Sequence, residues 1–157
     1  MRTLLMLGAA AFGLALAPAA HAQSKERILN FAAADGEMNA AKAKGRATLP
    51  VFFGHVRAPG PDESGFMIKY DLIPEAGVEY IWAEVISHKG DVTVARLSNV
   101  PDDKRFKIGQ QVTVRDAEII DWGYMKGPVM QGHYTTRVML PHLPAGEAAA
   151  IRKAFGW

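Results

Sequence analysis

Residues 66–72, Phe-Met-Ile-Lys-Tyr-Asp-Leu, mark the point at which the sequence changes from a helical to an extended pattern. Apolar residues alternate there with Lys69 and Asp71, and a period of two indicates a strand with one buried face. Two further apolar segments follow at Val78–Ser87 and Val92–Leu97, joined by a short turn. These three segments predict an antiparallel sheet. The second, apolar on both sides, is expected to be a central strand.

Two more strands and a helix are expected downstream. Residues 111–120 predict a strand with a bulge or full burial near its end, where two isoleucines stand side by side. Residues 121–132 are rich in Gly, Pro and aromatic residues and are expected to be irregular. Residues 134–140 alternate as a last strand, and residues 148–155 carry the apolar spacing of a C-terminal helix.

Two helices are expected upstream. Residues 35–44 are rich in Ala, Met, Glu and Lys, which favour helix, and Gly45 weakens this pattern. The apolar residues of segment 49–56 form the stripe of a second helix. The sequence therefore predicts an α+β fold: N-terminal helices packed on an antiparallel sheet of four to five strands, with a short C-terminal helix.

The first 22 residues have the three-part layout of a secretory signal peptide. Arg2 precedes an apolar run from Leu4 to Ala17, and small residues flank a cleavage point after Ala22. The run is shorter than the roughly 20 residues that a membrane-spanning helix needs. We therefore expect cleavage, a periplasmic or secreted protein, and no transmembrane segment in what remains.

This cleavage predicts three parts: a signal peptide at 1–22, a flexible lead-in at 23–34 and a single globular domain at 35–157. The chain has no cysteine, so disulfides, thiolate metal sites and cysteine nucleophiles are excluded. Lys plus Arg is 18 and Asp plus Glu is 16, and this near-neutral balance argues against nucleic acid as a partner. Nucleotide and zinc motifs are absent and the histidines stand apart, so neither a cofactor nor a metal is expected.

Two stretches that combine acidic and aromatic residues form the candidate site. A carboxylate opens an otherwise apolar row in Glu79-Tyr80-Ile81-Trp82, and another stands beside two aromatic rings in Asp121-Trp122-Gly123-Tyr124. Aromatic faces with a few polar groups are typical of small binding sites. The candidate binding residues are Glu79, Trp82, Asp121, Trp122, Tyr124 and Arg137.

A structural interpretation of the same residues stands beside the functional one. Glu79 would then lie in water at a strand edge, or pair with Arg137 or Arg96. Trp82 would be a core residue, and Asp121 would cap the turn that follows it.

The same motifs resemble a bacterial family, domain of unknown function 2314. The resemblance covers roughly residues 35–140. It is carried by Asp35-Gly36-Glu37-Met38-Asn39-Ala40-Ala41, Arg46-Ala47-Thr48-Leu49-Pro50, Glu79-x-x-Trp82, Asn99-x-Pro101, Gly109, Ile119-x-Asp121-Trp122-x-Tyr124 and Gly132-x-Tyr134-Thr135-x-Arg137. The resemblance implies no known activity and no catalytic residues. It implies small exported proteins, or modules beside repeat domains, which are more similar to binding or protective proteins than to enzymes.

Three hypotheses follow. The first is a non-catalytic periplasmic binding or protective module that recognises an envelope protein or a small ligand. The second is an envelope-acting hydrolase with Glu79 and Asp121 as acid and base. The third is a purely structural envelope protein whose aromatic residues are only core.

Overall fold

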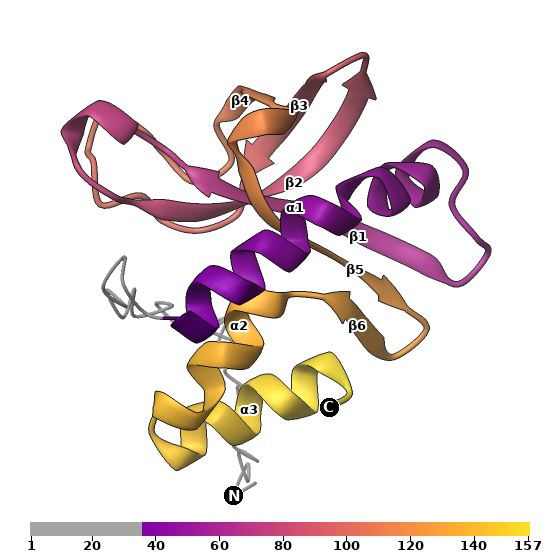
Figure 1. The fold of residues 1–157 in the computed structure, drawn as a ribbon, viewed down its shortest axis with the longest axis vertical. Coiled ribbons are helices and arrows are strands. Elements are labelled where there is room, and N and C mark those ends of the chain that lie inside the picture. Colours follow the sequence, from indigo (N-terminus) through magenta and orange to yellow (C-terminus); the bar gives the residue numbers. More distant parts are fainter. Residues whose placement is uncertain (1–35) are drawn as a thin grey trace, which may run out of the picture.

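An antiparallel sheet of six strands, in the order β4-β3-β2-β1-β5-β6, forms the middle of the fold (Figure 1). The computed structural model describes residues 36–157, so the expected signal peptide and lead-in lie outside the described residues. The strands are β1 (Glu63–Asp71), β2 (Tyr80–Lys89), β3 (Val92–Leu97), β4 (Gln111–Arg115), β5 (Ile119–Lys126) and β6 (Val129–Gly132). The α+β class and the antiparallel sheet are confirmed, whereas the expected count of four to five strands is wrong.

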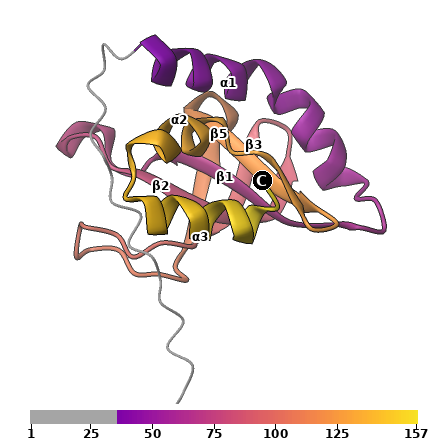
Figure 2. The same cartoon turned by 90° about the horizontal axis from the view of Figure 1, so that it is seen from below.

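Helices cover both faces of this sheet. Figure 2 shows α1 on one side and α3 on the other, with the strands between them. The helices are α1 (Gly36–Arg57), α2 (Tyr134–Met139) and α3 (Ala145–Phe155), and short 3₁₀ turns lie at η1 (Pro74–Ala76), η2 (Asp116–Glu118) and η3 (Leu140–His142). The expected C-terminal helix is confirmed, but α2 is a helix that the sequence pattern did not predict.

One continuous helix, α1, replaces the two expected N-terminal helices. Gly45 is buried within it, and a Cβ at this position would collide with the carbonyl oxygen of Ile120. The glycine therefore permits close packing of α1 on β5 instead of ending the helix. Buried residues recur every three to four positions along the whole of α1, because packing against the sheet outweighs the local cost of Gly45 and Pro50.

The segment expected as one strand at residues 111–120 is two strands. β4 lies at the edge of the sheet beside β3, and η2 then carries the chain across to β5, which pairs with β1. The expected bulge is present, because Lys69 pairs with Asp121 while Tyr70 pairs with Ile119. One residue of β5 is therefore unpaired between them.

The segment expected to be irregular, residues 121–132, is a regular hairpin of β5 and β6. The strand expected at residues 134–140 is instead α2 followed by η3. The chain leaves the sheet at Gly132 and His133, which both have left-handed φ angles, of 69° and 51°. A left-handed turn ends the extended path, so the alternation that follows it does not form a strand.

The main apolar core lies between α1 and the sheet. Phe52 is fully buried at its centre, and its ring stacks on Trp122 with centroids 5.2 Å apart. Phe53, Phe66 and Tyr124 surround it at centroid distances between 5.2 and 6.5 Å. This core places Trp122 and Tyr124 on the α1 side of the sheet.

Candidate functional site

Asp121 is buried on the opposite side of the sheet, with none of its surface exposed. Its carboxylate accepts hydrogen bonds from the backbone amides of Trp122, Tyr134 and Thr135 at 2.9, 3.2 and 2.8 Å. The hydroxyl of Thr135 donates a fourth at 2.6 Å. Asp121 therefore joins β5 to the first turn of α2. This is the capping role that the structural interpretation expected, although the capped helix begins 13 residues along the chain.

Lys69 is the neighbour of Asp121 on the adjacent strand β1, and its side chain is also buried. Its Nζ donates to the Thr135 hydroxyl at 3.5 Å. Burial raises the pKa of the Asp121 carboxyl, while the hydrogen bonds from Thr135 and the charge of Lys69 oppose that rise. The result is a buried polar layer, in which Asp121 and Lys69 stabilise each other by charge and share the Thr135 hydroxyl as a hydrogen-bond partner.

His133 completes this polar layer. Its ring stacks on Trp82 with centroids 3.9 Å apart, and Gly123 leaves the space for it, since a Cβ there would collide with the imidazole. Nδ1 lies 3.1 Å from the Thr136 hydroxyl oxygen, while Nε2 has no hydrogen-bond partner among the described residues. Burial, aided by the nearby charges of Lys69 and Arg137, lowers the pKa of His133 to about 3.

Trp82 is only 3% exposed, so its ring lines this polar layer and does not form an open surface for a ligand. The Nζ of Lys69 lies 5.4 Å from the centre of its ring, on the face of the sheet that also carries Asp121. The structure thus brings Trp82 and Asp121 to the same side, in a layer covered by α2 and α3.

Trp122 and Tyr124 point the other way, into the α1 core, and each is 5% exposed. The indole Nε1–H of Trp122 donates to the carbonyl of Gly45 at 3.1 Å and to the hydroxyl of Thr48 at 3.0 Å. The Tyr124 ring lies between Phe66 and the imidazole of His55. Both residues therefore fasten α1 to β5, and neither presents a ring to a ligand.

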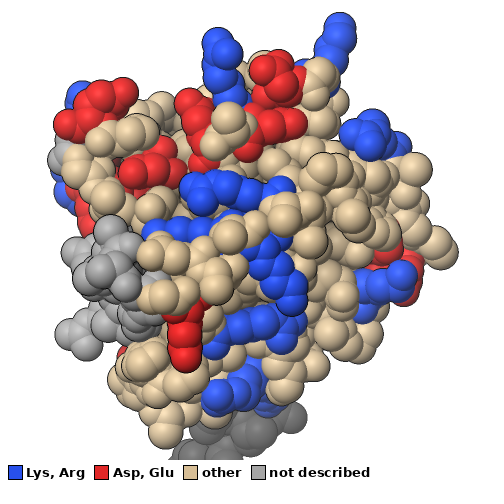
Figure 3. Space-filling view, in the orientation of Figure 1, with Lys and Arg blue, Asp and Glu red and all other residues tan. Residues whose placement is uncertain are grey.

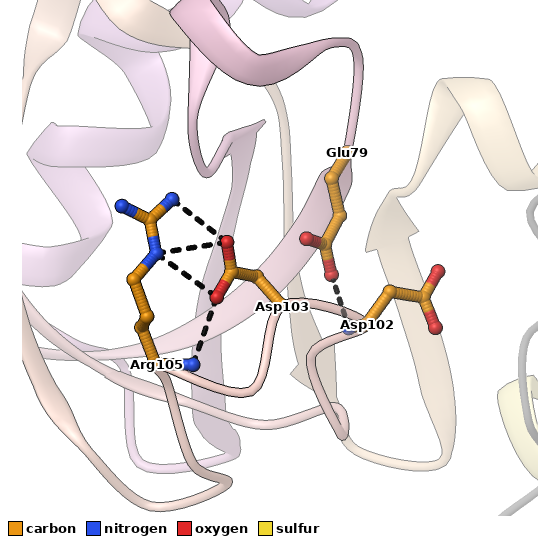
Figure 4. Close-up of polar contacts among 4 residues, drawn as sticks. All are labelled: Glu79, Asp102, Asp103 and Arg105. Carbon is orange, nitrogen blue, oxygen red and sulfur yellow. Dashed lines mark hydrogen bonds and ion pairs between the residues drawn. The ribbon is translucent and has the colours of Figure 1, made fainter.

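Glu79 lies apart from both layers, immediately before β2. Its Oε1 accepts a hydrogen bond of 2.6 Å from the amide of Asp102, while the next residue, Asp103, forms a fork with Arg105 (Figure 4). No ion pair joins Glu79 to Arg96 or Arg137 within the described part of the chain. Glu79 and Asp121 are therefore committed to different hydrogen-bond partners.

Arg137 anchors the C-terminal end of the chain to the edge of the sheet. Its Nε donates to the carbonyl of Gly132 at 3.1 Å, and its Nη2 donates to that of Met130 at 3.2 Å. The guanidinium also stacks over the ring of Trp157 at 3.7 Å. Arg137 is nevertheless exposed, and these partners, two carbonyl groups and a neutral ring, do not cancel its charge.

Sequence reasoning missed Lys69, His133 and Thr135. Lys69 is one of the polar residues of an alternating strand, and such residues normally face water. His133 is not close to any other histidine in the sequence. Thr135 belongs to a motif that was noticed, but its partner Asp121 is 14 positions away. Within residues 36–157 no three His, Asp or Glu side chains gather as a metal site would require, and none of the helices there is long and apolar enough to cross a bilayer.

Fold and buried polar layer together define a small α+β domain whose acidic and aromatic motifs build its interior. The chain belongs to the family DUF2314, described as an uncharacterized protein conserved in bacteria, which matches residues 35–157. The resemblance inferred from the motifs is thereby confirmed.

The chain is also similar to the uncharacterized protein YegJ of Escherichia coli (strain K12), with 25% identity over 92 residues. The matched region covers 58% of this chain and 60% of YegJ, so this chain spans less than two thirds of that relative. No solved structure matches the chain.

Proposed function

We propose that this protein is an exported, non-catalytic binding module of the bacterial envelope. One observation carries the proposal: the three helices present basic side chains that no carboxylate neutralises. We call this set the basic band, and it consists of Lys42, Lys44 and Arg46 on α1, Arg137 on α2, and Arg152 and Lys153 on α3. None of the six forms an ion pair with a carboxylate within the described residues.

Neutral aromatic rings hold three of these cations in place. Lys42 donates to the hydroxyl of Tyr80 at 3.1 Å, and its Nζ lies 4.4 Å from the centre of that ring. Lys44 lies 4.7 Å from the ring centre of Tyr134, and Arg137 stacks over a ring in the same way. A ring positions a cation without cancelling its charge. The band is therefore an ordered positive surface, which suits recognition of an acidic partner.

The hydrolase alternative finds no support in the site geometry. A pair of carboxyl groups that share acid and base roles must reach substrate in an open cleft. Asp121 is fully buried and Glu79 is occupied by the amide of Asp102. A purely structural role remains the second candidate, favoured by the finding that the aromatic motif residues Trp82, Trp122 and Tyr124 are core.

Export is supported by the sequence of residues 1–22, with their single early charge, apolar run and small residues before the cleavage point. The first test is to express the full chain in a Gram-negative bacterium, separate periplasm from cytoplasm, and sequence the N-terminus of the recovered protein. We expect periplasmic protein that begins at Gln23. Cytoplasmic protein that retains Met1 would contradict export.

The binding role is tested by capture on the immobilised mature chain, residues 23–157, of components from an envelope extract. The variant Arg46→Glu/Arg152→Glu/Lys153→Glu reverses three exposed charges of the band. We expect the wild type to retain an acidic component that this variant loses, with melting temperatures that agree. Nothing retained by the wild type, or equal retention by both proteins, would contradict a binding module that uses the band.

A further inference from the structure

We propose that the basic band docks the protein on a membrane surface rich in anionic phospholipids, an inference that rests on the proposed binding function and names its partner. The first support is the extent of the band. Its cations come from three separate helices, and Figure 3 shows Lys and Arg side chains running down the middle of the face on which α1 lies. Charges spread over a broad face match an extended anionic surface better than a single small anion.

The second support is the separation of charge. Asp and Glu side chains are most numerous toward the top of the view in Figure 3, where some Lys and Arg side chains also lie, and fewer of them border the lower part of the blue run. The chain as a whole is nearly neutral, with 18 basic and 16 acidic residues. On the face drawn in Figure 3, folding therefore gathers basic side chains into one run, although the composition is balanced. A negative surface would attract the band and repel the opposite end, so that binding would occur in one orientation.

The third support is the kind of residue that lies beside the cations. Tyr80, Tyr134 and Trp157 are each half-buried and each contacts a cation of the band. Tyrosine and tryptophan are favoured at the level of lipid headgroups, where one part of the ring is apolar and the other is wet. Aromatic rings next to unneutralised Lys and Arg thus fit phosphate headgroups.

The strength of such docking follows from the number of cations. Each Lys or Arg near an anionic bilayer raises the partition constant by about fivefold at moderate salt. Six cations give reversible attachment that salt weakens, because no acyl chain or spanning helix is involved. Once the expected signal peptide has been cleaved, the band would supply a membrane attachment that the cell can reverse.

The test is co-flotation of the mature chain, residues 23–157, with vesicles of phosphatidylglycerol and phosphatidylcholine, compared with phosphatidylcholine alone. The band variant is Arg46→Glu/Arg152→Glu/Lys153→Glu, whose wild-type side chains are exposed and form no ion pair within the described residues. The matched control is Arg57→Glu/Lys89→Glu/Lys107→Glu, which changes net charge equally at exposed positions outside the band. Circular dichroism and melting must show that both variants are folded.

We expect the wild type and the control to bind anionic vesicles, and 0.5 M salt to release both. The partition constant of the band variant should be at least about 100-fold lower. The milder variant Arg152→Gln/Lys153→Gln should lose about 25-fold, and it serves if the triple variant does not fold. Equal losses in band variant and control, or equal binding to neutral vesicles, would overturn the proposal.

The two proposals fail separately. If the wild type ignores anionic vesicles but retains an envelope protein or glycan in a band-dependent manner, the lipid assignment is wrong and the binding module stands. Binding to heparin or DNA without binding to vesicles would also overturn the lipid assignment. If neither vesicles nor envelope components are bound, both proposals are wrong.

Discussion

The two faces of the sheet are held by different physical means. The face toward α1 is built from aromatic rings around Phe52, which stabilise the fold by burying apolar surface and by close packing. The face toward α2 and α3 is built around Asp121, Lys69 and His133, whose polar groups form hydrogen bonds within the described residues, except for Nε2 of His133. The stability of the apolar face depends mainly on close packing, whereas that of the polar layer depends on the protonation of its members and on their hydrogen bonds.

Asp121 and Trp122 show how one motif supplies both faces. They are consecutive residues of β5, and consecutive side chains of a strand point to opposite sides. The pair that suggested a single acidic and aromatic pocket is therefore divided between two interiors. What the motif does is join α1, through Trp122, and α2, through Asp121, to the same strand.

The largest effect is expected from breaking the apolar face. Phe52→Ala removes a fully buried ring at the centre of the α1 core and should lower the free energy of unfolding by about 4 kcal/mol. Val51→Ala, at the exposed neighbouring position, is the matched control and should change it by less than about 0.5 kcal/mol. Urea unfolding followed by tryptophan fluorescence measures both. Similar losses in the two variants would mean that α1 is not held by this core.

Breaking the polar layer should come next. In Asp121→Asn an amide NH₂ replaces one acceptor oxygen and faces donors, so at least two of the four hydrogen bonds to the side chain are lost. We expect a loss of about 3 kcal/mol in the free energy of unfolding. Thr135→Val, which removes only the hydroxyl, should lose about 1 kcal/mol. An unchanged melting temperature in Asp121→Asn would show that the polar layer does not contribute to the stability of the fold.

A third experiment compares two opposing effects at position 45: the close packing of α1 on β5 and the helix propensity of the residue. On propensity alone, Gly45→Ala would stabilise α1 by about 1 kcal/mol. Because the new Cβ would collide with the carbonyl of Ile120, we expect destabilisation of about 2 kcal/mol instead. Gly54→Ala lies in the same helix, where a Cβ would meet no atom within 4 Å, and should be neutral or stabilising. The opposite sign for Gly45→Ala would contradict the close packing of α1 on β5.

The smallest effect expected is a change of about 1.4 kcal/mol between pH 7.5 and pH 5.5, which comes from the titration of His133 in the polar layer. The pKa of His133 is about 3 in the folded protein and about 6.5 when unfolded, so below pH 6.5 the unfolded chain takes up a proton that the folded chain refuses. Its contribution to stability is complete above pH 6.5 and falls by about 1.4 kcal/mol per unit as pH decreases toward 3. The raised pKa of Asp121 acts in the opposite sense, since the folded chain holds that proton more tightly above pH 4.

The contribution of His133 is isolated by comparison with His133→Asn, because Asn tolerates the left-handed backbone at this position and carries no titrating group. Unfolding in urea at pH 7.5 and pH 5.5 should show the wild type losing about 1.4 kcal/mol more than the variant. Parallel pH profiles for the two proteins would show that His133 does not titrate on unfolding.

The sequence predicted much of the fold and little of the site. Apolar segments joined by a short turn located β2 and β3. Period-two alternation located β1, because one face of this strand lies in the α1 core. It failed at residues 134–140, where left-handed residues at Gly132 and His133 turn the chain into a helix. Helix propensity failed at Gly45, whose role depends on a backbone 75 positions away at Ile120.

By itself, the sequence determined the α+β class, the antiparallel sheet, the C-terminal helix and membership of the family. These features rest on periodicity and short motifs, which depend on residues close to one another in the sequence. Only the tertiary structure decided that Trp82, Asp121, Trp122 and Tyr124 are interior and that Lys69 and His133 join them. Burial and charge proximity depend on which strands pair and which helices cover them, and those contacts connect residues far apart in the chain.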